Sequence, residues 1–202
     1  MVWRPFPLDR VTIDDWKPVF RPVAWFALAL YLLFFLYAYS RHGQFLLLDW
    51  VNLAIHEAGH PLFGVFAGRE EVGPGYTLMI LGGTLLELIV PFALAVVFFF
   101  RREVPGVAFC LFWFFENFLY IGHYMATART MDIVLVGGGE HDWEVLFTHW
   151  NILVHDQQIG QAMNLLGWLG MLLAVAWFAY RSFQDGGRAE QVTFNGIADH
   201  LG

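Results

Sequence analysis

The residues best suited to do chemistry in this chain form the pentapeptide His-Glu-Ala-Gly-His at positions 56–60. In a helix, positions i and i+4 share one face, so the imidazoles of His56 and His60 converge on one point. Two imidazoles one turn apart suit Zn²⁺, which in catalytic sites takes three protein ligands and keeps one position for water. Glu57, beside the first histidine, is placed to act as a general base. The pattern therefore predicts a hydrolytic zinc site.

The residues before the pentapeptide extend its polar face. Asp49, Asn52, His56 and His60 follow the 3-4-4 spacing of one helical stripe within an otherwise apolar run at 46–66. An ionisable side chain at the centre of a membrane helix costs about 2.5–3.5 kcal/mol on insertion scales. The stripe is therefore expected to face protein, metal or water, and a satisfied polar core is the alternative to a metal site.

The composition indicates a polytopic membrane protein. Of 202 residues, 58% are hydrophobic and 14% are charged, which does not suit a soluble domain. A net charge of −7 disfavours a nucleic-acid partner. Cys110 is the only cysteine and excludes an intramolecular disulfide. The expected fold is an all-α membrane helix bundle surrounded by lipid bilayer.

Hydropathy predicts about five membrane-length helices, at 22–39, 45–66, 76–100, 104–126 and 159–180. These helices make up a membrane domain at 22–181, and within it a Gly-rich loop and a short amphipathic interfacial helix are expected at 127–158. A polar membrane-proximal arm (1–21) and a polar tail (182–202) flank this domain. Four basic residues precede the first expected span and one follows it directly, which favours a cytoplasmic N-terminus.

Further polar side chains lie in the other expected spans. A charged or polar stripe in a membrane helix is a functional-site hypothesis by default. The alternative is that these groups only pair with one another between helices. We consider six of the polar residues as alternative metal ligands or as groups that support the ligands: Asp49, Glu87, Glu116, Asn117, Tyr120 and His123.

The third ligand is open on the sequence alone. The run Gly137–Gly139 gives the loop after the fourth span the freedom to turn back toward the motif helix and deliver His141 and Asp142. We rank His141 first because imidazole is a good zinc ligand. Asp142 follows, since it also suits the N-cap of the next helix, and then Glu116 and His123.

A His-Glu-x-x-His motif within a membrane helix resembles the site-two protease family of intramembrane zinc metalloproteases. The resemblance covers positions 56–60 and the apolar helix around them. It implies that His56 and His60 bind zinc, that Glu57 activates water, and that a distant aspartate is the third ligand. In that family the aspartate lies in an Asn-Pro-rich or Leu-Asp-Gly context on a later span. This chain has no such motif, and its only Asp-Gly, at 185–186, lies beyond the last expected span.

More of the chain is similar to a group of small bacterial membrane proteins. The shared pieces are the HEAGH helix, Gly82-Gly83, the stretch 117–129 and the pattern Gly-Gly-x-x-His-Asp-Trp that ends at Trp143. This resemblance implies a bacterial cytoplasmic (inner) membrane.

These observations favour a membrane-embedded zinc metallopeptidase that hydrolyses membrane-associated polypeptides, including membrane-spanning ones. Tyr120 or His123 is a candidate to stabilise the developing oxyanion. The alternative is a non-catalytic metal-binding membrane protein, either a transporter or a sensor.

Overall fold

The computed structural model of the chain describes residues 16–41, 43–66, 73–133 and 140–198. The Gly137–Gly139 run and most of the N-terminal arm lie outside the described residues. Every regular element within them is helical, which confirms the all-α prediction. The elements are α1 (Arg21–Ser40), α2 (Asp49–Gly64), α3 (Pro74–Phe100), α4 (Val104–Ala126), α5 (Asp142–His149), the short 3₁₀ helix η3 (Leu153–His155) and α6 (Asp156–Ala198).

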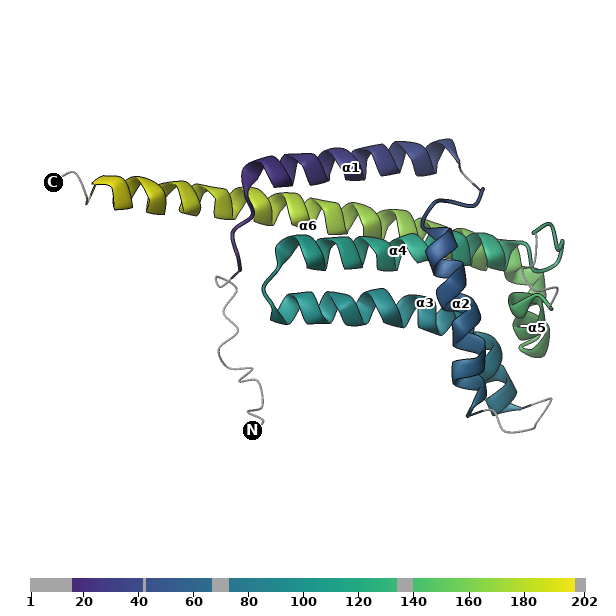
Figure 1. The fold of residues 1–202 in the computed structure, drawn as a ribbon. Helices are drawn as coiled ribbons and strands as arrows, with labels where there is room; N and C mark the ends of the chain where they lie inside the picture. The colour runs from purple at the N-terminus through teal and green to yellow at the C-terminus, as the bar shows by residue number, and fades with distance from the viewer. Residues whose placement is uncertain (1–15, 42, 67–72, 134–139, 199–202) are drawn as a thin grey trace, which may run out of the picture.

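Four helices are long and apolar enough to cross a membrane: α1, α3, α4 and the segment Leu153–Gln184 that includes most of α6. They lie side by side in the order α1, α6, α4, α3 (Figure 1), and α4 makes its most extensive contact with α6. Proline in the first turn begins α1, α3 and α4, where the missing N–H has no helical partner in any case. The chain therefore forms a helical membrane bundle.

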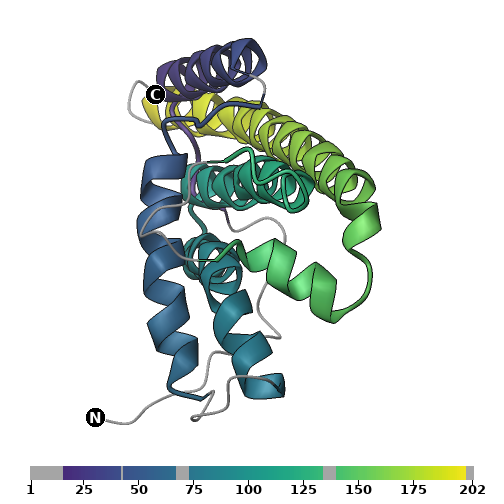
Figure 2. The same ribbon diagram turned by 90° about the vertical axis from the view of Figure 1, so that its right-hand side faces the viewer.

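The motif helix α2 differs from the span expected at 45–66. It has 16 residues, which at about 1.5 Å per residue is roughly 24 Å, short of the ~30 Å hydrocarbon layer. The helix starts late because the Asp49 carboxylate accepts the backbone N–H of Leu46 at 2.6 Å, which holds the preceding residues in a turn. Two perpendicular views show α2 running across the long helices near one end of the bundle (Figures 1 and 2).

Glycines let the helices around the motif approach closely. A Cβ on Gly59 of α2 would overlap the backbone carbonyl of Gly82 in α3, and a Cβ on Gly122 of α4 would lie 2.6 Å from the carbonyl oxygen of Gly160 in α6. Contact at backbone distance is how membrane helices associate without large side chains between them. The first turns of α3 thus lie along α2, and the later turns lie along α4.

The amphipathic helix expected after the Gly-rich loop is α5. Its apolar residues Trp143, Leu146 and Phe147 are buried together with Ile80 of α3 and Tyr124 of α4. The start of α5 is thereby held against the two helices that flank α2.

The last helix, α6, begins at Asp156, whose carboxylate binds the Arg129 guanidinium at 2.7 and 2.8 Å. Its backbone continues to Ala198 and so takes in most of the expected polar tail at 182–202.

Candidate metal centre

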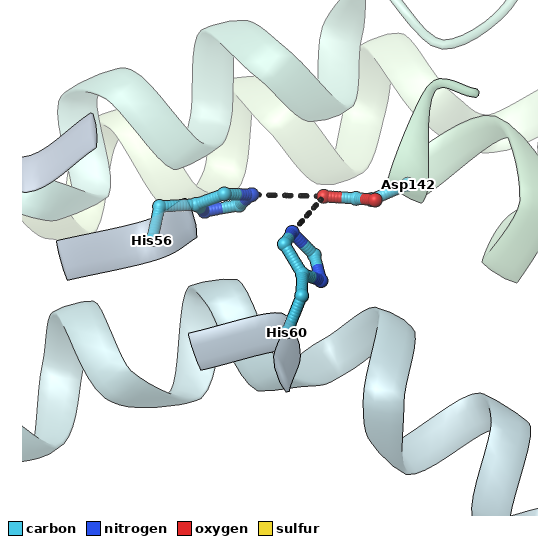
Figure 3. A group of neighbouring side chains, drawn as sticks. All are labelled: His56, His60 and Asp142. Atoms are coloured by element: carbon cyan, nitrogen blue, oxygen red, sulfur yellow. Dashed lines mark hydrogen bonds and ion pairs between the residues drawn. The ribbon is translucent and has the colours of Figure 1, made fainter. Parts of the chain in front are cut away.

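Three side chains from two distant parts of the chain converge beside α2 (Figure 3). His56 and His60 lie one turn apart on α2, and Asp142 is the first residue of α5. The Asp142 Oδ2 atom lies 2.9 Å from His56 Nε2 and 3.4 Å from His60 Nε2. One ligand atom from each residue falls within 4.8 Å of the other two.

Both imidazoles are oriented by contacts on their far side. The Nδ1 of His60 lies 3.1 Å from the Met79 carbonyl oxygen, an acceptor, so Nδ1 donates and the Nε2 lone pair is left for a metal. The Nδ1 of His56 lies 3.4 Å from a carboxylate oxygen of Glu87. A histidine that binds a metal commonly has such a carbonyl or carboxylate behind it, which fixes the tautomer and the ring orientation.

The structure reverses the expected roles of His141 and Asp142. His141, which the sequence ranks first as the third ligand, is the N-cap of α5, because its Nδ1 accepts the Glu144 N–H at 3.3 Å. Its ring packs on Tyr124 with centroids 4.1 Å apart and lies outside the metal group. Asp142 is held by its backbone N–H, which donates to the Tyr124 hydroxyl at 3.2 Å, and its carboxylate points to the two histidines.

The electrostatics of the two residues differ accordingly. Burial raises the pKa of Asp142, but the contacts with His56 and His60 outweigh burial and hold that pKa below its usual range. Burial lowers the pKa of His141, so its imidazole stays neutral and can accept the capping hydrogen bond. Asp142 is thus present as a carboxylate, the form that binds cations.

The three residues fit zinc on chemical and geometric grounds. Two nitrogen or oxygen ligands, each about 2.0–2.2 Å from zinc at the tetrahedral angle, lie roughly 3.3 Å apart. The 2.9 and 3.4 Å separations from Asp142 bracket that value. Gly83 contributes by having no side chain, since a Cβ there would lie 2.6 Å from His56 Nε2. Two imidazoles and one carboxylate leave a fourth tetrahedral position, as catalytic zinc sites do.

Other residues singled out in the sequence form a second buried polar cluster farther back along α2. Asn52 donates to Glu116 at 2.9 Å and accepts from the Trp113 indole N–H at 2.7 Å. Asp49 is a neighbouring buried carboxyl group. Glu116 therefore connects α2 to α4 and is not part of the metal group. Asn117, the next residue, donates to the Glu87 carbonyl at 3.3 Å and so connects α4 to α3.

Glu57 and His123 lie outside the group of three ligands. The Glu57 side chain is exposed. His123 lines a cavity of about 410 Å³ between the ends of α1, α4 and α6, together with Tyr120 and Asp49.

Sequence reasoning missed two supports of the site. The Met79 carbonyl that orients His60 carries no signal, because backbone carbonyls are alike in every residue. The Tyr124 hydroxyl that holds Asp142 was visible only as one aromatic residue among many in α4.

Comparisons with protein-family models, with curated proteins and with solved structures found no match to this chain. The relation to the site-two proteases rests on the His-Glu-x-x-His motif and stays a hypothesis.

Proposed function

We propose that the protein is a membrane-embedded zinc metallopeptidase. The observation that carries the proposal is the convergence of His56, His60 and Asp142, whose ligand atoms all lie within 4.8 Å of one another, with the Asp142 oxygen 2.9 and 3.4 Å from the two imidazole nitrogens. Two features favour a hydrolytic role over a purely structural one. Glu57, next to His56 in the sequence, is exposed. The group has three protein ligands, whereas a structural zinc site is usually closed by four.

The chemistry divides between the metal and the chain. When bound, zinc lowers the pKa of coordinated water toward about 7 and polarises the scissile carbonyl. Glu57 takes a proton from the attacking water as the new C–O bond forms, and returns it to the amine nitrogen as the C–N bond breaks. Tyr120 is the candidate to donate a hydrogen bond to the developing oxyanion. The N-terminal orientation and the bacterial inner membrane remain predictions.

The ligand set is tested by zinc content. Purified wild-type protein is expected to hold one zinc per chain, measured by mass spectrometry, and Asp142→Ala is expected to lose it because only two ligands remain. Asp132→Ala, an exposed aspartate outside the group, is the matched control and should keep its zinc. Full zinc content in Asp142→Ala would contradict the assignment.

The peptidase role is tested separately with Glu57→Gln, which keeps the size of the side chain but removes the base. This variant should bind zinc as the wild type does and fail to cleave fluorescein-labelled casein, used as a general polypeptide probe. If it cleaves at the wild-type rate, Glu57 is not the base.

The second candidate, a zinc transporter, is favoured by one observation. The cluster of Asp49, Asn52 and Glu116 gives the chain a second group of buried polar side chains, next to a cavity. Transport predicts zinc uptake into proteoliposomes that contain a fluorescent zinc indicator, and loss of uptake in Glu116→Gln. The peptidase proposal predicts no uptake.

A further inference from the structure

The outer face of α2 is an exposed apolar stripe. At 100° per residue, Trp50, Val51 and Leu62 fall on one side of the helix and are 49–66% exposed. Leu47 and Val65, just beyond its two ends, are 70% and 79% exposed. The opposite side carries the buried residues of α2 that face the bundle. No other described helix lies outside α2 on this side (Figure 2). This set of residues is called the outer stripe below.

The direction of α2 decides what covers the outer stripe. Three of the four membrane-length helices, α1, α3 and α6, present several exposed leucines and phenylalanines, as lipid-facing helices do, whereas α4 is the most buried of the four. The helix α2 runs across them near one end (Figures 1 and 2), so its apolar face continues the lipid-facing surface of the bundle at that end. A helix with one apolar and one polar face that lies across the spans is typical of membrane interfaces.

The position of the site along α4 gives its depth. The middle of α4 is Phe115, and its last residue is Ala126. Tyr124, which holds Asp142 and lies 6.1 Å from the His56 ring, is nine residues beyond the middle, or about 14 Å along the helix axis. Half the hydrocarbon layer is about 15 Å, so the site lies near the membrane surface.

Glu57 supports the same placement. It is exposed at the edge of the outer stripe, in the middle of α2. If α2 crossed the membrane, this carboxylate would face lipid at mid-depth, at a cost of about 2.5–3.5 kcal/mol on insertion scales. On a helix at the surface, it can reach water.

We infer that α2 is an interfacial helix whose outer stripe contacts lipid and that it holds the metal group at the membrane surface. One consequence rests on the proposed function: the polypeptide bonds that reach the site lie just outside a membrane span, and bonds at mid-membrane do not reach it.

The placement of α2 is tested with spin labels on single cysteines in a Cys110→Ala background, reconstituted in lipid vesicles. Val51→Cys and Leu62→Cys lie three turns apart on the same side of α2, about 17 Å along its axis. Leu33→Cys, 60% exposed midway along α1, is the control for mid-membrane depth. Depth is measured from the accessibility of each label to oxygen and to a water-soluble nickel complex.

The two α2 labels are expected to contact lipid at shallow depths that differ by less than half of 17 Å. Both should lie much closer to the membrane surface than the Leu33 label does. A difference near 17 Å would mean that α2 spans the membrane and would overturn the inference. A label that is accessible to the nickel complex but not to oxygen, which concentrates in lipid, would overturn the inference that the outer stripe contacts lipid.

The consequence for substrates has its own probe, a synthetic peptide with one membrane span and an unstructured tail. Cleavage is expected in the tail next to the span, mapped by mass spectrometry and absent with Glu57→Gln. Cleavage in the middle of the span would contradict the surface placement. No cleavage would count against the proposed function and this consequence, while the label depths still decide where α2 lies.

Discussion

Gly83→Ala tests the geometry of the site with one methyl group. A Cβ at position 83 would lie 2.6 Å from Nε2 and 2.7 Å from Cδ2 and Cε1 of His56. It would therefore press on the face of the imidazole. Ordinary contact between such atoms is about 3.5 Å or more, so the ring must move by roughly 3.5 − 2.6, or about 0.9 Å.

That displacement is large for a metal ligand. Ligand distances in metal sites hold to about 0.2 Å, and the Glu87 carboxylate 3.4 Å from Nδ1 also restrains the position of the ring. Changes to groups that support a ligand typically cost about 10–100-fold in metal affinity, which corresponds to roughly 1.4–2.7 kcal/mol. We expect Gly83→Ala to weaken zinc binding by this amount, measured by competition with a chromogenic chelator in detergent.

Two neighbouring glycines serve as controls. A Cβ on Gly64 would lie 3.3 Å from the flexible Met79 side chain, so Gly64→Ala should bind zinc as the wild type does. A Cβ on Gly82 would meet the Gly59 carbonyl oxygen at 2.7 Å, so Gly82→Ala disturbs the contact of α2 with α3 without touching the His56 ring. If Gly83→Ala is folded and keeps wild-type affinity, or loses no more affinity than Gly82→Ala does, the reasoning is refuted.

Two further variants test the reversed roles at α5 and the second polar cluster. His141→Asn should keep full zinc content by mass spectrometry, because asparagine also caps a helix and Asp142 supplies the ligand; loss of zinc would return His141 to the ligand set. Asn52→Leu leaves buried groups of Glu116 and Trp113 without a partner, so we expect a loss of about 1–3 kcal/mol in unfolding free energy. Denaturation in mixed micelles measures that loss, and an unchanged midpoint would mean that the cluster does not hold α2.

The parts of the site that the sequence predicts are the local ones. The pairing of His56 with His60 follows from helical spacing within one element. The close contact at Gly82 and Gly83 follows the rule that small residues in a membrane helix permit close approach. Asp142 was among the candidates, ranked after His141, and it is the one that lies beside His56 and His60. Which of two adjacent residues caps a helix and which faces the metal depends on how α5 is rotated against α4, and that rotation is set by distant packing around Tyr124.

The span expected at 45–66 shows the limit of hydropathy. The run at 46–66 is apolar enough on average to suggest a crossing helix, yet its polar residues other than Glu57 fall on one face. A one-sided pattern over 16 residues also suits a helix that lies across a bundle, with apolar residues outward and Asp49 to His60 inward. Average hydropathy does not separate the two cases, whereas the contacts with α3 and α4 do.

The charges around α2 give a physical reason for a metal at this position. Glu87 is 1% exposed and Asp142 is 8% exposed, and in the part of the chain that the structure describes their ion pairs are with histidines. Two buried carboxylates beside two neutral imidazoles carry a charge of −2, which is costly away from water. Zn²⁺ would cancel that charge with Asp142 as its ligand and Glu87 behind His56. Without the metal, the same balance requires protons on the histidines. Zinc and protons therefore compete for one site, which couples the affinity for zinc to pH.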